Sequence, residues 1–232
     1  MPTVEPDFAL NLAAVEERIQ RAAERCGRKR ESITLVAVSK KFPAERLADA
    51  YAAGLREFGE NYVQEFAEKR PRLSPLTDAR YHLIGHLQSN KAKLACELFQ
   101  VIQTVDSPKL LARLNDAVAE RATTIEVMLE VKLSAEDSKS GVEPAHIPAL
   151  LAAAAASPHV NLTGLMTMPP WSADPEHSRP YFRRLAELAA EYHLPKLSMG
   201  MSGDLETAIE EGATIIRVGT ALFGNRPKPP SA

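Results

Sequence analysis

Cysteine is scarce in this sequence. Only Cys26 and Cys96 occur among 232 residues, and they do not form the C-x-x-C spacing of a metal or redox motif. Both fall in stretches with helical periodicity, so we expect reduced thiols in a cytoplasmic protein. The sequence also lacks a set of His, Cys, Asp or Glu residues at metal-ligand spacing, and we therefore expect no metal site.

Long apolar runs and an excess of one charge are missing as well. No stretch approaches the roughly 20 apolar residues that a membrane-spanning helix needs. Residues 1–8 carry prolines and acids where a signal peptide would have a basic and then an apolar segment. The 28 basic and 30 acidic residues give a net charge of −2, which offers nucleic acid or an anionic membrane no attraction. We expect a soluble protein with neither kind of partner.

The sequence does contain a regular alternation of short apolar runs and amphipathic segments. The apolar runs predict strands at 33–38, 55–58, 81–84, 99–104, 124–131, 160–166, 196–199 and 214–218. Amphipathic helices are predicted between them, and one of these begins with Ser107 as its N-cap and Pro108 as its first residue. A further helix, over 7–26, precedes the first strand.

Eight strands that are each followed by a helix predict a (β/α)8 barrel with an extra N-terminal helix. A doubly wound open sheet is the alternative. It fits less well, because such sheets usually have fewer strands and often a glycine-rich turn after the first one, which is missing here. No linker interrupts the pattern, so we expect residues 1–232 to form one domain that ends in a loose, proline-rich tail at 226–232.

The first predicted strand leads into a serine and two lysines. Its continuous apolar run indicates a strand buried on both faces. Lys40 follows where loss of water would favour the neutral amine, a nucleophile that can form a Schiff base with an aldehyde. Taken alone, this stretch favours the simpler interpretation, that Lys40 marks the point at which the strand reaches solvent. Because strand residues alternate between faces and both faces are apolar, the pattern leaves open whether Lys40 or Lys41 points inward.

The loops after the seventh and eighth predicted strands are rich in small and hydroxyl residues. Active sites of such barrels lie at the carboxyl ends of the strands, and these two loops often hold phosphate. Ser202 lies in one loop and Gly219 and Thr220 in the other, and each loop opens a helix whose N–H groups favour an anion. Either loop alone could be an ordinary glycine turn, but two at these positions favour a phosphate site. With Lys40 on the same face, they predict a phosphorylated aldehyde, either pyridoxal phosphate or a phosphosugar.

Arg217 helps to distinguish these two ligands. It lies in the otherwise apolar strand 214–218, so we expect it to point into the barrel mouth, where a buried guanidinium requires an acceptor. The nitrogen of a pyridine ring would be such an acceptor. A structural salt bridge with Glu130 or Glu60 is the alternative.

Segments spread over nearly the whole chain resemble the pyridoxal-phosphate homeostasis proteins, which are single-barrel relatives of the N-terminal domain of alanine racemase. The segments are 36–40 (VAVSK), 58–65 (FGENYVQE), 82–91 (HLIGHLQSNK), 138–141 (SKSG), 164–166 (GLM), 198–206 (SMGMSGDLE) and 217–224 (RVGTALFG). The second, the third and the last are specific to this family. Pro170 and Trp171, the N-terminal residues and the tail depart from its pattern.

The resemblance implies that pyridoxal 5'-phosphate is held as a Schiff base on Lys40 rather than on Lys41. The phosphate would lie around Ser202 and Thr220, and the ring nitrogen near Arg217. The cofactor-binding residues implied in this way are Lys40, Asn61, Met201, Ser202, Arg217, Gly219 and Thr220.

Three further polar residues of these motifs have simpler interpretations. His82 lies in the middle of a predicted strand, where an interior histidine satisfied by hydrogen bonds is the commoner case. Lys91 is most simply a solvated helix residue, and His86 at the mouth fits a structural or a ligand-binding role equally.

Two functions remain, a protein that buffers or delivers pyridoxal phosphate without turnover and a pyridoxal-phosphate-dependent amino-acid racemase. By the resemblance, a racemase needs the lysine on one face of the substrate and a tyrosine from a second domain and a partner subunit on the other. We expect no second domain in this chain, and its five tyrosines fall in predicted helices or strands, so we expect no catalysis. A cofactor-free Schiff-base aldolase is a third possibility. Candidate recipients of the cofactor are apo pyridoxal-phosphate enzymes, and we expect a monomer or a weak dimer.

Overall fold

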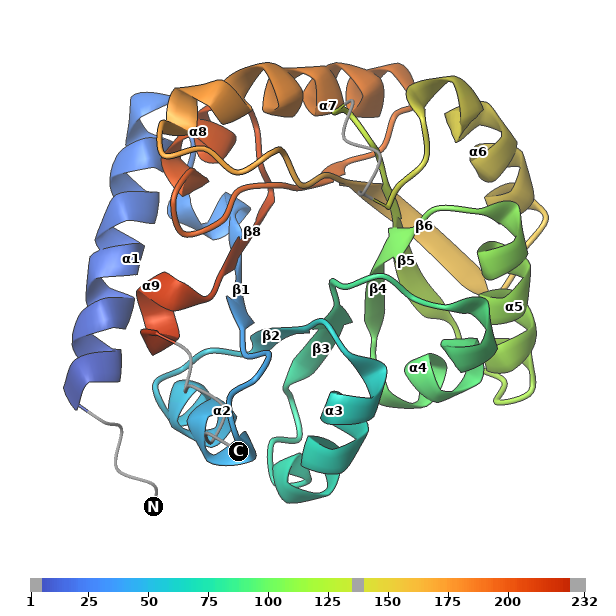
Figure 1. Cartoon of the computed structure of the whole chain (residues 1–232), viewed down its shortest axis with the longest axis horizontal. Coiled ribbons are helices and arrows are strands. Elements are labelled where there is room, and N and C mark those ends of the chain that lie inside the picture. Colours follow the sequence, from blue (N-terminus) through green and yellow to red (C-terminus); the bar gives the residue numbers. More distant parts are fainter. Residues whose placement is uncertain (1–5, 135–139, 226–232) are drawn as a thin grey trace, which may run out of the picture.

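The structure, a computed structural model, describes residues 6–134 and 140–225. Within these ranges eight parallel strands close into a barrel, in which each strand pairs with the next and β8 pairs with β1 (Figure 1). The strands are β1 (Thr34–Val38), β2 (Glu57–Glu60), β3 (Arg80–Leu83), β4 (Val101–Val105), β5 (Ile125–Glu130), β6 (Val160–Met166), β7 (Lys196–Ser198) and β8 (Ile215–Val218). The predicted (β/α)8 barrel is confirmed.

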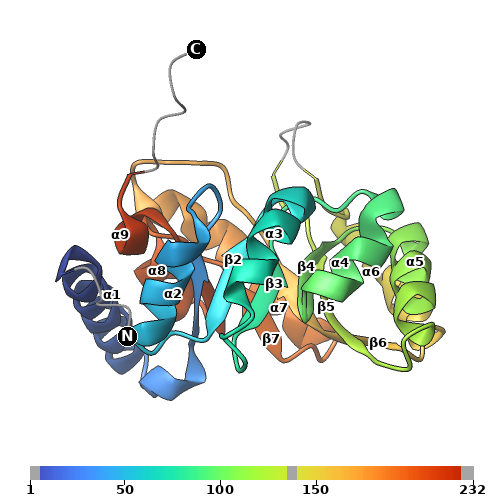
Figure 2. The ribbon, with the colours of Figure 1, turned by 90° about the horizontal axis from the view of Figure 1, so that it is seen from below.

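Helices follow the strands and surround the barrel (Figures 1 and 2). They are α1 (Pro6–Arg25), α2 (Ala44–Ala52), α3 (Val63–Lys69), α4 (Ala92–Leu98), α5 (Pro108–Ala119), α6 (Ile147–Ala155), α7 (Arg179–Glu191), α8 (Leu205–Glu210) and α9 (Thr220–Phe223). Short 3-10 turns are η1 (Arg30–Ser32), η2 (Arg70–Leu73), η3 (Ser89–Lys91), η4 (Pro144–His146) and η5 (Pro175–Ser178). The extra N-terminal helix is α1, which lies beside α8 and α9.

Two local predictions show how far sequence signals define the element ends. Ser107 caps α5 as predicted, because its side chain accepts from Leu110 N at 3.4 Å. The second strand, predicted at 55–58, begins instead at Glu57. The reason is that Leu55 N donates to Ala50 O and thus ends α2, with Gly54 between them at a φ of 100°. At its other end β2 extends two residues further than predicted and includes Glu60.

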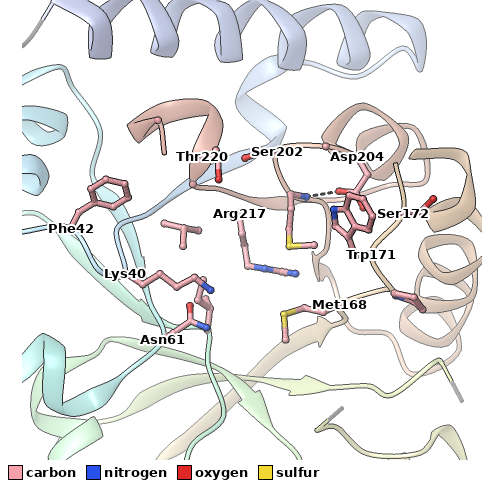
Figure 3. Close-up of a pocket in the computed structure, with 17 residues that line it drawn as sticks. Lys40, Phe42, Asn61, Met168, Trp171, Ser172, Ser202, Asp204, Arg217 and Thr220 are labelled. Carbon is pink, nitrogen blue, oxygen red and sulfur yellow. Dashed lines mark hydrogen bonds between the residues drawn. The ribbon is translucent and has the colours of Figure 1, made fainter. Parts of the chain in front are cut away.

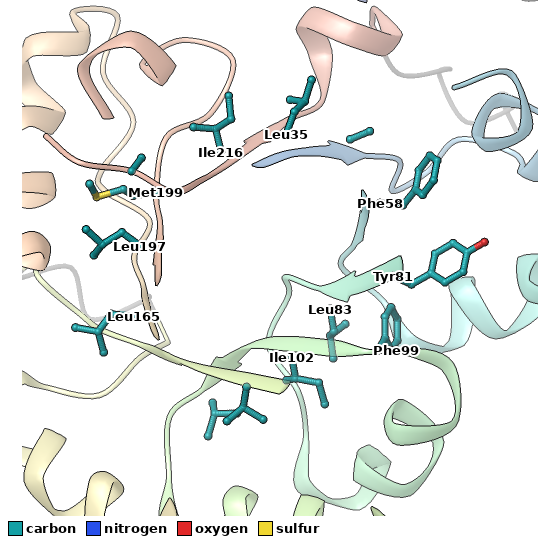
Figure 4. Packing of buried hydrophobic residues seen from close by; sticks show 14 of the residues in the cluster. Leu35, Phe58, Tyr81, Leu83, Phe99, Ile102, Leu165, Leu197, Met199 and Ile216 are labelled. Atoms are coloured by element: carbon teal, nitrogen blue, oxygen red, sulfur yellow. The ribbon is translucent and has the colours of Figure 1, made fainter. Parts of the chain in front are cut away.

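Residues of each strand alternate between two different environments. Those that point outward pack against the helices and form the main hydrophobic core, among them Leu35, Phe58, Leu83, Ile102 and Ile216 (Figure 4). Those that point inward form only a small apolar cluster of Val36, Met128, Met166 and Ile215. The buried polar groups His82, Gln103, Ser198 and Arg217 also belong to barrel strands. The barrel interior thus contains buried polar side chains beside a small apolar cluster.

Membrane spans, metal sites and thiols can be examined within the described ranges. There, no helix combines the length and the apolar character that a membrane crossing requires, and no cluster of three or more His, Cys, Asp or Glu side chains suits a metal ion. Cys26 and Cys96 are free thiols, and burial raises the pKa of Cys96 to about 12. Lys139 of the family motif and the tail at 226–232 lie outside the described residues.

A first prediction tests the packing between helices and barrel. Phe66 of α3 is fully buried, and its ring centroid lies 4.8 Å from that of Tyr81 and 4.9 Å from that of Phe99. We expect Phe66→Ala to lower the free energy of unfolding by about 3–5 kcal/mol, because burial is lost and a cavity is left. Leu10 is the control because its side chain is 70% exposed. Leu10→Ala should change the free energy of unfolding by less than about 0.5 kcal/mol. Equal losses in chemical denaturation would contradict this packing.

Candidate functional site

A cavity of about 430 Å³ opens at the carboxyl ends of the strands (Figure 3). Its size is within the range of small-molecule sites. The structure brings every residue of the predicted site to its wall: Lys40, Asn61, Met201, Ser202, Arg217, Gly219 and Thr220. The wall also contains residues that the sequence analysis did not assign to the site: Val38, Phe42, Ile84, Met168, Pro170, Trp171, Ser172, Gly203, Asp204 and Gly224.

Lys40 lies in a tight turn after β1. Phe42 N donates to Ser39 O at 3.1 Å, and Lys41 adopts a φ of 66°, which costs a non-glycine residue on the order of 1–2 kcal/mol. Lys40 lines the cavity, whereas Lys41 is exposed. Strand alternation does not decide between the two lysines, because β1 ends at Val38, before the chain reaches them.

A buried ion-pair network holds this turn from outside the barrel wall. Lys69 Nζ lies 3.0 Å from Glu60 Oε1 and 2.6 Å from Glu65 Oε1, and it donates to Ser39 O at 3.1 Å. Glu60 Oε1 also accepts from Ser39 Oγ at 2.9 Å, and Glu65 Oε1 accepts from Lys41 N at 2.6 Å. Burial raises the pKa of Glu60, and its bonds to Lys69 and Ser39 oppose that shift. The residues on both sides of the cavity lysine are therefore bonded to the network.

Arg217 lies in the cavity wall and is only 3% exposed. It donates from Nη1 to Ser198 Oγ at 2.6 Å and from Nη2 to Thr167 O at 2.9 Å. Burial lowers the pKa of Arg217 to about 10, and the negative charges of Asp204 and Glu130 oppose this shift. The guanidinium is thus charged at neutral pH, and these two bonds use two of its five N–H groups.

The predicted alternative partners of Arg217 bond elsewhere. Glu60 pairs with Lys69, and both oxygens of Glu130 accept from Ser140 Oγ at 3.2 Å. Burial raises the pKa of Glu130, and Ser140 and the charge of Arg217 oppose that shift. Within the described part of the chain, Arg217 forms an ion pair with neither carboxylate, so the salt-bridge alternative is wrong.

The loops after β7 and β8 meet on one side of the cavity, where Ser202 and Thr220 lie close together (Figure 3). Ser202 Oγ accepts from Ala221 N at 3.3 Å, so its hydroxyl proton can point to another acceptor. Arg18 of α1 donates to Ser202 O at 3.0 Å and pairs with Glu206 at 2.6 Å. The extra N-terminal helix thus fixes the loop that contributes Ser202.

Gly200 and Asp204 shape the same loop. Gly200 has a φ of 91°, and a Cβ there would lie 2.5 Å from Ala208 Cβ, so only glycine fits. Asp204 Oδ1 accepts from Met201 N at 2.7 Å, drawn as a dashed line in Figure 3, and Oδ2 accepts from Ser178 Oγ at 2.8 Å. Asp204 thus holds the loop through both carboxylate oxygens, one bonded to Met201 and the other to Ser178 of η5.

Asn61 contributes an unsatisfied polar atom to the cavity wall. Its Oδ1 is buried and has no hydrogen-bond partner among the described residues. Gly85 packs against its backbone, since a Cβ on Gly85 would lie 2.3 Å from Asn61 O. An unpaired buried acceptor costs about 1–3 kcal/mol. A donor on a bound ligand would remove this cost.

The remaining polar residues of the motifs have clear environments. His82 is buried and bonded to Glu57 and Gln103, so its prediction as a satisfied interior histidine is confirmed. Lys91 ends η3 and is half-buried, where a solvated position was predicted. His86 is exposed, with Nδ1 3.7 Å from Asp106 Oδ2.

Two aromatic residues near the mouth differ from expectation. Tyr62 lies in the loop between β2 and α3 and is 49% exposed, so the prediction that every tyrosine lies in a helix or strand is wrong. Trp171 lines the cavity and is 86% exposed. Its departure from the family pattern was the only sequence signal for this position. The polar Gln103 within an apolar run was a comparable signal for the barrel interior.

Comparison with known proteins identifies one family. The family model described as "Alanine racemase, N-terminal domain" matches residues 10–227. The pyridoxal phosphate homeostasis protein of Escherichia coli is 43% identical over 227 residues, which cover 95% of this chain and 97% of that protein. The structure of PipY from Synechococcus elongatus with PLP bound has a TM-score of 0.80 at 40% identity and covers 89% of this chain and 100% of that one. An alanine racemase from Clostridium difficile shares the fold, with a TM-score of 0.74 at 13% identity over 96% of this chain and 57% of that one.

A second prediction concerns the strained turn. Glu65→Ala removes the acceptor for Lys41 N. Lys41 must then keep its left-handed backbone conformation, with a φ of 66°, without that hydrogen bond. In a Lys41→Gly background this φ carries no penalty, and we expect Glu65→Ala to cost about 1 kcal/mol less there than in the wild type. A double-mutant cycle of unfolding free energies measures the difference. Glu68, exposed on the same helix, is the control. A coupling no larger than that between Glu68→Ala and Lys41→Gly would contradict the role of Glu65.

Proposed function

This chain belongs to the family of pyridoxal phosphate homeostasis proteins, and we propose that it binds pyridoxal 5'-phosphate at the barrel mouth without turning over a substrate. Lys40 would hold the cofactor as a Schiff base, and the protein would buffer it or deliver it to apo pyridoxal-phosphate enzymes. The observation that carries this proposal is the meeting of Lys40, Arg217 and Ser202 in the wall of one cavity.

The residues of the cavity fit this cofactor group by group. Pyridoxal phosphate supplies an aldehyde, a phosphate and a pyridine ring that can withdraw electrons. Lys40 offers an amine for the aldehyde, and the hydroxyls of Ser202 and Thr220 offer donors for the phosphate. Arg217 offers N–H donors for the ring nitrogen. The buried Oδ1 of Asn61, which has no partner among the described residues, could accept a bond from the bound molecule.

The chemistry of Arg217 supports storage over catalysis. The pyridine ring withdraws electrons most strongly when its nitrogen is protonated, which an acidic partner promotes. A guanidinium only donates, and it retains its charge here because its pKa remains near 10. Arg217 is therefore expected to keep the ring nitrogen unprotonated and the cofactor weakly activated.

The composition of the cavity wall also supports a non-catalytic role. Racemisation requires a second proton-transferring group on the face opposite the lysine. Among the described residues that line the cavity there is no tyrosine, and both oxygens of the lining carboxylate Asp204 are already bonded. The wall thus offers no evident second base.

A third prediction concerns the attachment of the cofactor. We expect the purified protein to absorb as a Schiff base and borohydride to fix the cofactor on Lys40, as identified by peptide mapping. Lys40→Ala should lose this fixation and keep weaker binding, because the groups around the phosphate remain. Lys41→Ala is the matched control and should be labelled like the wild type. Labelling of Lys41 or Lys139 in the wild type would refute the assignment.

A fourth prediction concerns turnover. With the wild type we expect no deuterium exchange at Cα of alanine or other amino acids near ordinary enzyme rates, on the order of 1–10³ per second. Arg217→Glu should raise the exchange rate, because a carboxylate favours a protonated ring nitrogen. Arg217→Leu, which can neither donate nor accept, should mainly weaken binding. Wild-type exchange at enzymatic rates would identify an enzyme and overturn the non-catalytic proposal.

A further inference from the structure

We propose that a hydrogen-bond chain through the barrel interior orients Arg217 toward the cofactor, with Ser198, Gln103 and His82 as positioning residues. The inference rests on the proposed function, since it concerns how the cavity is prepared for the ring of pyridoxal phosphate. It goes beyond that function because none of these three residues lines the cavity.

The chain of contacts starts at Arg217 of β8 and crosses the barrel interior to His82 of β3 and Glu57 of β2. Arg217 Nη1 donates to Ser198 Oγ at 2.6 Å, and Ser198 Oγ donates to Gln103 Oε1 at 2.6 Å. Gln103 Nε2 lies 2.9 Å from His82 Nδ1, and His82 Nε2 lies 2.5 Å from Glu57 Oε2. Gln103 belongs to β4 and Ser198 to β7, which do not pair in the sheet, so this bond spans the interior.

The direction of each bond follows from what each group can donate or accept, with the amide of Gln103 oriented as in the structure. Arg217 can only donate, so Ser198 Oγ accepts from it and gives its own proton to Gln103 Oε1. The amide of Gln103 then presents its NH2 group to His82, whose Nδ1 must be the unprotonated nitrogen. The remaining proton of the neutral ring is on Nε2 and is donated to Glu57.

The reversed arrangement is less favourable. A proton on His82 Nδ1 would require Gln103 to turn its oxygen toward His82 and its NH2 group toward Ser198. Ser198 Oγ would then accept from both Gln103 and Arg217, and no acceptor in the chain would remain for its hydroxyl proton. Ser198 and Gln103 are fully buried, and leaving a buried donor unpaired is unfavourable. A doubly protonated His82 would also add a positive charge to a chain that ends at Arg217.

Charged groups close the His82 end of the chain. Glu57 of β2 bonds to His82 and lies 3.6 Å from Arg80 of β3, which is 3.1 Å from Glu126 of β5. Glu126 in turn pairs with Lys196 of β7 at 2.6 Å. Burial opposes ionisation of Glu57, but the hydrogen bond with His82 and the charge of Arg80 outweigh it and lower the pKa of Glu57. The acceptor at the end of the chain is therefore an ionised carboxylate.

The chain determines where the guanidinium of Arg217 can point. The carboxylates whose fields act on Arg217 are Asp204 and Glu130. The bond to Ser198, together with the bond to Thr167 O, holds the guanidinium away from direct pairing with either carboxylate. Without an acceptor for its own proton, the Ser198 hydroxyl would no longer be fixed as an acceptor for Arg217.

The test combines one measurement on the cofactor-free protein with two on the loaded protein. Nitrogen-15 NMR of the imidazole, assigned by comparison with His82→Gln, should show His82 with a proton on Nε2 only at pH 7.5. Gln103→Met should weaken binding of pyridoxal 5'-phosphate at least tenfold and change the signal of a nitrogen-15-labelled cofactor ring. Gln103→Glu keeps an acceptor for Ser198 and should bind within threefold of the wild type, with His82 now protonated on both nitrogens.

Ser157→Ala is the control, because it removes a buried serine hydroxyl outside the barrel interior, one that donates to Ala153 O at 2.8 Å. It should leave both the affinity and the ring signal unchanged. Wild-type-like binding by Gln103→Met, or a proton on His82 Nδ1 in the wild type, would overturn the inference. If the wild type does not bind pyridoxal 5'-phosphate, the proposed function fails, and the His82 measurement alone then decides whether the chain has the stated proton arrangement.

Discussion

The burial of a guanidinium inside the barrel is the constraint on which the site depends. An isolated charge in such a place is unfavourable unless hydrogen bonds compensate for the lost water. Arg217 has this compensation from Ser198 and from a backbone carbonyl at the end of β6. Ser198 in turn needs Gln103, and Gln103 needs His82. One buried charge therefore explains why polar residues occupy inward positions that aliphatic side chains usually fill in barrels of this type.

The turn that contains Lys40 is held by contacts outside the barrel. There, Lys69 of α3 bonds to Glu60, Glu65 and the carbonyl of Ser39. The loop that contributes Ser202 is fixed by α1 in a similar way, through Arg18. Groups on rigid elements thus support both loops, and such support is what keeps a binding site in place before its ligand arrives.

The sequence predicted the barrel because its signals are local. Each strand is a short apolar run, and caps and glycines mark the helix ends, so errors were confined to a few boundary residues such as the start of β2. Arg217 was predicted to point into the mouth because a charge in an apolar strand has few other places to go. Which lysine faces the cavity could not be derived from periodicity, because a turn with a left-handed Lys41 replaces the strand at that point. The family resemblance supplied the assignment to Lys40.

The connection from Arg217 to His82 is different in kind, because its central bond joins residues 95 positions apart in the chain and on opposite sides of the barrel. Gln103 was visible in the sequence as a polar residue in an apolar run, but its partner depends on closure of the sheet. Glu60 shows the opposite case. The sequence allows it as a partner of Arg217, but it pairs with Lys69 of α3 instead.

The openness of the mouth would suit the proposed function, in which a bound cofactor is also released. Trp171 lines the cavity and is largely exposed, so water reaches the rim. Water works against controlled proton abstraction from a bound substrate, but the same water is the reactant that reverses a Schiff base. Contacts to a phosphate and to a ring nitrogen can then retain the cofactor without a permanent covalent bond. Affinity from the preformed loops and Arg217, together with a reversible link to Lys40, would allow the barrel to store the cofactor and still give it up.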